Sequence, residues 1–229
     1  MPGRFTLTTD ATELRTAFPW LTGIPDDFRP RYNIAPQQPL TIVLNDGQHK
    51  IDFLNWGFIP SFSSGAKMTN LLINARSEGI AKTPSFRGPF KRRRCLVLAD
   101  GYYEWVKVPR KKEKLAYRVM LKTRHPFAFA GVWDSWQSMD GSEIKTCAVI
   151  TCEPNALVSQ IHHRMGVILR DQDYEKWLRP SEADPKELKP LLAPYPAEDM
   201  LYYPVSTLVS NARNDSPECI KAIGNEVTI

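Results

Sequence analysis

The chain contains few residues suited to disulfide, metal or membrane chemistry. Its four cysteines form no Cys-x-x-Cys pair, and its four histidines lack the spacing of a metal site. No run of about 18 or more apolar residues is present, and the opening residues MPGRFTLTTD lack the apolar centre of a secretion signal. These absences favour structural thiols, no metal or other cofactor, no membrane contact and a soluble intracellular protein, in the cytoplasm or nucleoid, or in the nucleus of a eukaryote.

Positive charge is concentrated in one part of the chain. The formal net charge is only +5, and mild basicity of this kind is common in proteins that bind no nucleic acid. Between Arg87 and Arg124, however, the sequence contains thirteen Lys and Arg residues and only three acidic residues. We interpret this basic stretch as a candidate phosphate-facing surface.

Short strand-like runs dominate the middle of the sequence. Two strands within residues 40–59 are predicted to meet at a turn at Asp46-Gly47, a pair that accepts positive φ. Helical signals are fewer, and no regular βαβ alternation appears. We therefore predict an α+β fold, one domain over residues 1–229, with a mainly antiparallel, barrel-like sheet flanked by a few helices. The other predicted strands cover 94–106, 116–121, 127–133 and 146–152, the helices cover 10–18, 154–161, 171–178 and 188–192, and the proline-rich residues 19–39 are expected to be irregular.

Two stretches place polar side chains among apolar ones. In LLINARSEG, Asn74 and Arg76 share one face of an extended strand, where they could clamp a phosphate or sugar hydroxyl, or simply end a strand in water. In ADGYYEWV, the pKa of Glu104 would rise toward a value useful for proton transfer if the side chain faces inward, whereas an outward carboxylate would be merely solvated.

A histidine pair marks a further candidate. His162 and His163 precede Arg164 in QIHHRMGVIL. They could form half of a metal site, but the sequence offers nothing to complete it. A single histidine acting as acid or base beside Glu104 is the more economical interpretation, and a structural histidine is the commoner occurrence. At the other candidate positions, GRF could be an untethered terminus and RYNIAP an ordinary turn in which Asn33 bonds its own backbone.

Seven motifs occur in a characteristic order along the chain. Together they resemble the motif series of the SRAP (SOS response-associated peptidase) family. The resemblance implies a single α+β domain with a positively charged channel for single-stranded DNA. The motifs are GRF near the start, RYNIAP, WGFIP, INARSE, ADGYYEW, IHHRM and SNARND.

The family's chemistry uses a cysteine that becomes the first residue once the initiator Met is removed. Its amine and thiol condense with the aldehyde of an abasic site to give a stable thiazolidine crosslink. By resemblance, Asn74 positions this terminus and the sugar, and Glu104 transfers protons for imine formation and for self-removal of the Met. His162 then acts as acid or base on the opened sugar. We therefore expect Asn74, Glu104 and His162 to converge beside residue 2.

The same resemblance implies a set of DNA contacts. Fixed donors would hold the phosphates that flank the lesion without reading bases, and aromatic rings would stack on exposed bases. The expected partner is single-stranded DNA with an abasic site, bound by a monomer. The phosphate contacts are Arg4, Arg76 and Thr151, the stacking residues are Trp105 and Phe62, and Asn33 and Arg164 complete the DNA-binding set.

Position 2 departs from the family pattern because it is Pro2. Proline has no thiol, so the thiazolidine cannot form. Three interpretations stay open: a change that disables crosslinking, a divergent member that only binds, or a nucleophilic proline. If Met1 is removed, Pro2 is a secondary amine, whose iminium with an aldehyde favours strand cleavage by β-elimination.

Two further alternatives belong to other functional classes. The protein could be a non-catalytic module that docks nucleic acid through its basic stretch, in which case reversing the charges of residues 92–94 should abolish binding. It could also be a peptidase, since the family cleaves its own amino terminus. No Ser-His-Asp series can be assigned to support peptide cleavage in trans.

Overall fold

A closed barrel of five strands forms the centre of the molecule. The computed structural model describes residues 2–64, 71–108, 114–138 and 140–229. In the barrel, β10 pairs with β4, β4 with β3, β3 with β6, β6 with β9, and β9 again with β10. All of these pairs are antiparallel except β10–β4. The barrel strands are β3 (Pro39–Leu44), β4 (Ile51–Trp56), β6 (Arg94–Ala99), β9 (Phe127–Gln137) and β10 (Glu143–Cys152).

Two short strands extend one end of β10. The first, β5 (Asn74–Arg76), runs parallel to β10, with Asn74 opposite Val149. The second, β11 (Met165–Gly166), pairs antiparallel with the same strand. The end of β10 is therefore a meeting point for segments far apart in sequence.

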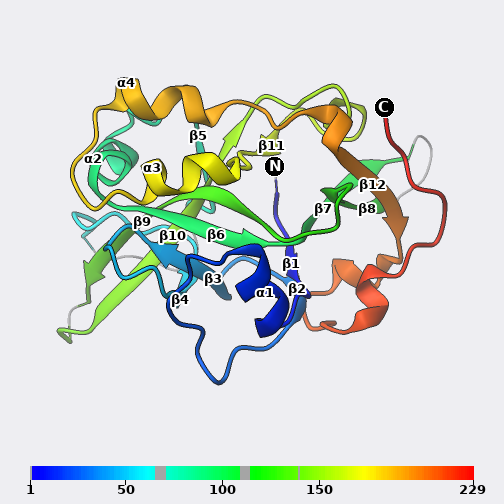
Figure 1. Ribbon diagram of the computed structural model, residues 1–229, viewed down its shortest axis with the longest axis horizontal. Coiled ribbons are helices and arrows are strands. Elements are labelled where there is room, and N and C mark those ends of the chain that lie inside the picture. The colour runs from blue at the N-terminus through cyan, green and yellow to red at the C-terminus, as the bar shows by residue number, and fades with distance from the viewer. Residues whose placement is uncertain (1, 65–70, 109–113, 139) are drawn as a thin grey trace.

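A second sheet of five antiparallel strands lies beside the barrel (Figure 1). Its order is β12, β8, β7, β1, β2. Phe5 of β1 joins the two layers, because its ring lies 4.5 Å from that of Trp56 and 5.0 Å from that of Phe129. The strands are β1 (Phe5–Leu7), β2 (Arg31–Ile34), β7 (Gly101–Lys107), β8 (Lys114–Leu121) and β12 (Met200–Val205).

Short helices cover the barrel strands, with α2, α3 and α4 above them and α1 below in Figure 1. Helix α1 begins at a capping box, in which the carboxylate of Asp10 accepts from the backbone N–H of Glu13 and the carboxylate of Glu13 accepts from the backbone N–H of Asp10. The α-helices in the described part of the chain are α1 (Ala11–Ala17), α2 (Pro84–Arg92), α3 (Tyr174–Leu178) and α4 (Pro185–Leu188), with 3₁₀ segments at Val158–Gln160, Asp171–Asp173, Lys189–Leu192, Ala197–Asp199, Thr207–Ser210 and Pro217–Ile220. None of these helices has the length and apolar run needed to span a bilayer.

The predicted α+β fold with an antiparallel, barrel-like sheet is confirmed, but several boundaries were wrong. The predicted run 94–106 is two strands in different sheets, separated at Asp100. Residues 19–39 are not wholly irregular, because they include β2. The helix predicted over 154–161 is only a 3₁₀ turn. Helix α2 was missed because Pro89 inside it argues against a helix, although Pro84 occupies the first position, where proline is tolerated.

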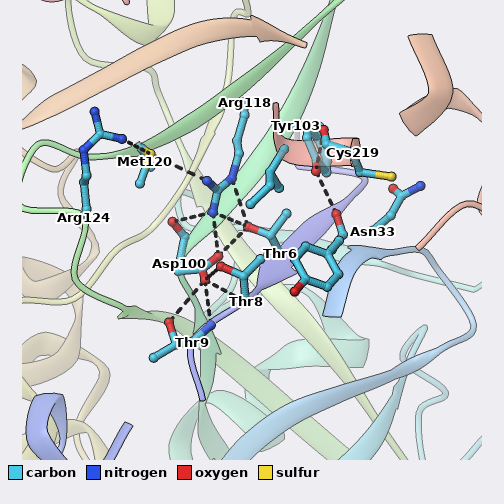
Figure 2. A network of polar contacts seen from close by, with 12 residues as sticks. Thr6, Thr8, Thr9, Asn33, Asp100, Tyr103, Arg118, Met120, Arg124 and Cys219 are labelled. Carbon is cyan, nitrogen blue, oxygen red and sulfur yellow. Dashed lines mark hydrogen bonds and ion pairs between the residues drawn. The ribbon is translucent and has the colours of Figure 1, made fainter. Parts of the chain in front are cut away.

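A buried polar network fixes the corner between β6 and β7 (Figure 2). Asp100 forms an ion pair with Arg118 of β8 at 2.8 Å, and both side chains are almost completely buried. The hydroxyl of Thr6 donates to Asp100 at 2.5 Å, and the backbone N–H of Thr8 does so at the same distance. The carboxylate therefore anchors β1, the strand that follows the first residues of the chain.

Candidate functional site

The beginning of the chain is held by a side chain from β5. The amide Nδ2 of Asn74 donates to the carbonyl oxygen of Pro2 at 3.1 Å. Pro2 is buried and Asn74 is half-buried. Residue 2 therefore has a defined position beside the end of β10, where β5 pairs.

Strand pairing brings Glu104 to the same place. Phe5 lies opposite Tyr102, and the backbone N–H of Tyr103 donates to the carbonyl of Arg4 at 3.0 Å. In an antiparallel pair, the next positions along this register are Gly3 and Glu104. The carboxyl group of Glu104 is 3 % exposed and therefore lies inside, next to the first residues of the chain.

His162 completes the cluster from the connection that precedes β11. Its Nε2 lies 3.9 Å from Oε2 of Glu104. Burial raises the pKa of Glu104 to about 7 and lowers the pKa of His162 to about 4. Near neutral pH the imidazole is therefore uncharged, while the carboxyl group is close to its midpoint and can both accept and donate a proton.

Arg4 and Trp105, which follow Gly3 and Glu104 in the sequence, form a second cluster. The guanidinium carbon of Arg4 lies 5.6 Å from the ring centroid of Trp105, within cation–π range. Nη1 of Arg4 donates to the side-chain oxygen of Asn33 at 2.8 Å and to the carbonyl of Val209 at 2.5 Å. The indole Nε1 of Trp105 donates to the hydroxyl of Ser210 at 3.2 Å. A cation and an aromatic face therefore stand together beside residues 2 and 3.

The side chain of Asn33 is buried and hydrogen-bonded to a later segment of the chain. It is fully buried, and its Nδ2 donates to the carbonyls of Asn211 and Asn214 at 3.1 and 2.7 Å. Asp215 accepts from the backbone N–H of Tyr32 at 2.5 Å and from that of Asn33 at 3.0 Å. The SNARND and RYNIAP motifs are thus bonded to one another, and the amide of Asn33 orients Arg4.

Three further predicted residues gather at the end of β10. Thr151 is fully buried and lies opposite Arg76 on β5, whose side chain is exposed. Nη2 of Arg164 donates to the carbonyl of Thr151 at 2.8 Å. Glu78, which the sequence interpretation did not single out, forms a two-point ion pair with Arg164. The sequence signal that could have identified Glu78 is its position in the INARSE motif, two residues after Arg76.

Other predicted features lie apart from this cluster. Phe62 is 68 % exposed, on a segment bonded to the outer part of β9 through Asp134. The basic stretch does not form one surface in the described residues. Arg94 and Arg118 are buried, and Arg94 donates to the carbonyls of Trp177 and Arg179 at 2.9 and 2.7 Å. The part of the stretch at residues 109–113 lies outside the described residues.

The thiols and metal-ligand types form no further site in the described part of the chain. All four cysteines are buried and unpaired by disulfides. Among the same residues, no group of three or more His, Cys, Asp or Glu side chains is placed to hold a metal ion.

The chain is similar in sequence to proteins named abasic site processing proteins. The chain is 40 % identical to the abasic site processing protein YoqW of Bacillus subtilis (strain 168), over 97 % of this chain and all of that protein. It is 33 % identical to the abasic site processing protein HMCES of Gallus gallus, over 86 % of this chain and 67 % of that protein.

Solved structures share the fold. A crystal structure of a Bacteroides thetaiotaomicron protein matches with a TM-score of 0.83 and 27 % identity, covering 96 % of this chain and 98 % of the other. A Bordetella bronchiseptica protein matches with a TM-score of 0.74 and 23 % identity, covering 89 % and 99 %. The profile of the SOS response associated peptidase (SRAP) family matches residues 1–212. The chain therefore belongs to the SRAP family.

Proposed function

We propose that this protein processes abasic sites in DNA and binds them in single-stranded DNA. One observation carries the proposal: Asn74, Glu104 and His162, from three distant segments, gather around Pro2 and Gly3. The names of the relatives, abasic site processing proteins, support the same activity.

Each of the three side chains has a chemical role in this proposal. Asn74 holds the backbone of Pro2 and so fixes the place where an aldehyde would meet the start of the chain. Glu104 transfers protons, which its pKa of about 7, raised by burial, allows near neutral pH. His162 is an uncharged imidazole at that pH and can act as a base on the opened sugar.

Proline at position 2 limits the covalent chemistry. Without a thiol, the thiazolidine crosslink of the family cannot close. If Met1 is removed, the secondary amine of Pro2 can attack the aldehyde carbon and lose water to give an iminium. Removal of a proton from the adjacent sugar carbon then expels the 3′ phosphate. We therefore propose that stable crosslinking is absent, and that strand cleavage depends on removal of Met1.

The DNA contacts in this proposal surround the same cluster. Arg4 and Arg76 hold flanking phosphates, while Trp105 presents a ring for a base to stack on. Thr151 is buried, and its carbonyl accepts from Arg164 and from the backbone N–H of Ser77, so it acts by holding these neighbours in place. Asn33 acts by orienting Arg4, to which it is bonded. Phe62, although exposed, is supported only by the family resemblance.

Denaturing gels test the chemistry. The parent and a Pro2→Cys variant are incubated with single-stranded DNA that contains one abasic site, with and without borohydride, and intact mass records whether Met1 is present. A stable band for the variant alone supports lost crosslinking. A borohydride-dependent band for the parent, with strand cleavage, supports the amine. If neither protein forms any adduct or cleaves the strand, the catalytic part of the proposal fails.

A binding titration tests the partner. We expect tighter binding to single-stranded DNA with an abasic site than without one, and weaker binding at higher salt. Arg76→Ala should weaken binding, whereas Arg15→Ala on α1, at the other end of β1, should not. Salt-insensitive, weak and equal binding to both DNAs would rule the proposal out. Equal but salt-sensitive binding, with Glu104→Gln neutral, would instead favour the non-catalytic binding module.

A further inference from the structure

Glu78 lies outside the cluster at Pro2, but it is linked through Arg164 to His162 of that cluster. Oε1 and Oε2 of Glu78 accept from Nη1 and Nη2 of Arg164 at 2.6 and 3.0 Å, a two-point geometry that fixes the guanidinium plane. The guanidinium is only 10 % exposed, whereas the carboxylate is 50 % exposed. Nη2 also donates to the carbonyl of Thr151 at 2.8 Å. Arg164 is thus clamped between the segment after β5 and the end of β10.

The backbone of Arg164 in turn faces His162. Its N–H donates to Nδ1 of His162 at 2.9 Å, and its carbonyl oxygen lies 3.0 Å from the same nitrogen. Both polar backbone groups of Arg164 therefore define the surroundings of Nδ1. Nδ1 can accept from this N–H or donate to this carbonyl, depending on the tautomer, and in either case Nε2 is the nitrogen that faces Glu104.

The two terminal nitrogens of the Arg164 guanidinium are engaged within the protein, whereas its buried Nε has no hydrogen-bond partner among the described residues. The terminal nitrogens already bond Glu78 and Thr151. A neighbouring carboxylate also cancels the charge that would attract a phosphate. Arg76, the other cation that acts on Glu78, is by contrast exposed.

We infer that Glu78 and Arg164 are positioning residues for His162, holding Nδ1 so that Nε2 turns toward Glu104. Arg164 then acts through the imidazole rather than as a direct phosphate contact. The inference rests on the proposed function for its catalytic consequence, but its structural content concerns the free protein. The two can therefore be tested separately.

The first test uses the protein without DNA. Long-range ¹H–¹⁵N correlation NMR of the histidine rings reports which nitrogen carries the proton. In the parent, His162 should show a single tautomer, because the backbone of Arg164 fixes the surroundings of Nδ1. Glu78→Gln, Glu78→Ala and Arg164→Gln should give a mixture of tautomers. Glu187→Gln is the matched control, because Glu187 pairs with Arg179 at 2.8 Å with 51 % exposure.

The outcome does not depend on every variant folding. If Arg164→Gln fails to fold because it removes a buried group, the two Glu78 variants still decide, since that side chain is half exposed. A parental His162 spectrum in both Glu78 variants would overturn the inference.

The second test measures consequences on DNA in the Pro2→Cys background. Glu78→Gln should lower the initial rate of adduct formation roughly tenfold or more, as small misplacements of reacting groups do, while the dissociation constant and its salt slope stay unchanged. A salt slope reduced by about 0.7 in Arg164→Gln, the value for one phosphate contact on a single strand, with an unchanged His162 spectrum, would overturn the inference. If Pro2→Cys itself neither binds nor reacts, the proposed function fails, and the NMR result still decides the role of Glu78.

Discussion

Asp100 and Arg118 form an ion pair of 2.8 Å that is shielded from solvent on both sides. The pair joins the corner between β6 and β7 to β8, and the hydroxyl of Thr6 bonds to both partners. Gly101 leaves the space for this contact, because a Cβ atom there would lie 2.7 Å from Nε of Arg118. The position of β1, and hence of residue 2, depends on this pair.

Removing one partner should therefore destabilise the fold strongly. We expect Asp100→Ala to lower the free energy of unfolding by about 3–5 kcal/mol, because it leaves a buried cation without a counter-charge. Glu226→Ala is the control, since the Arg124–Glu226 pair is exposed at 55 % and 41 % and should contribute less than about 1 kcal/mol. Urea denaturation measures both, and similar losses in the two variants would contradict the prediction.

Glu104 should make stability depend on pH. Burial raises its pKa from 4.5 to about 7, so the folded state binds the proton more tightly than the unfolded state. Its stabilising contribution is complete below pH about 4.5 and is lost as pH rises through about 7. Between pH 5 and 8.5 the parent should lose about 2–3 kcal/mol more than Glu104→Gln.

Denaturation at the two pH values measures this difference. Burial lowers the pKa of His162 to about 4, so in the folded protein this imidazole stays uncharged over the whole range in both the parent and Glu104→Gln. The exposed Glu153→Gln serves as the control and should follow the parent. If the free energy of unfolding depends on pH equally in the parent and in Glu104→Gln, the carboxyl group of Glu104 is not shielded from water.

Substitution of Asn33 should reduce stability, whereas substitution of Arg76 should reduce DNA binding. Asn33→Ala removes bonds to the carbonyls of Asn211 and Asn214, so we expect a loss of about 1–3 kcal/mol in unfolding free energy. Arg76→Ala, at an exposed position, should leave stability unchanged and reduce the salt slope of DNA binding by about 0.7. Denaturation and binding titrations of both variants check this, and a selective binding defect in a fully stable Asn33→Ala would contradict it.

Gly166 is required for packing. Gly166 is buried in β11, where a Cβ atom would lie 2.4 Å from a ring carbon of Phe129. Gly166→Ala should cost about 1–3 kcal/mol of stability through overpacking. Gly23→Ala, whose Cβ would meet its nearest neighbour at 3.5 Å, is the tolerated control. Equal thermal midpoints would contradict the prediction.

Local signals in the sequence predicted local structure well. A helix was predicted over residues 10–18, and the observed helix has Asp10 as its N-cap and runs from Ala11 to Ala17. Asp46-Gly47 predicted a turn between two strands, and Gly47 has a φ of 79° there, although the loop is longer than a tight hairpin because Val43 pairs with Ile51.

Long-range partners explain what the sequence could not reveal. The break at Asp100 depends on Thr6 and Arg118, and the burial of Asn33 depends on carbonyls about 180 positions later in the chain. Arg94 looked like part of a basic surface, but its carbonyl acceptors come from residues that fold back onto it. Reversing the charge of Arg94 would therefore disrupt the fold rather than test DNA binding.

The segment after β12 bonds to both outer strands of the second sheet. Tyr202 exchanges backbone bonds with Val227, and the N–H of Ile223 donates to Pro204, along one outer strand. Asp215 takes two N–H groups of the other outer strand, β2. Outer strands engaged in this way offer little template to a neighbouring polypeptide, which protects a concentrated solution of the protein against intermolecular β-pairing.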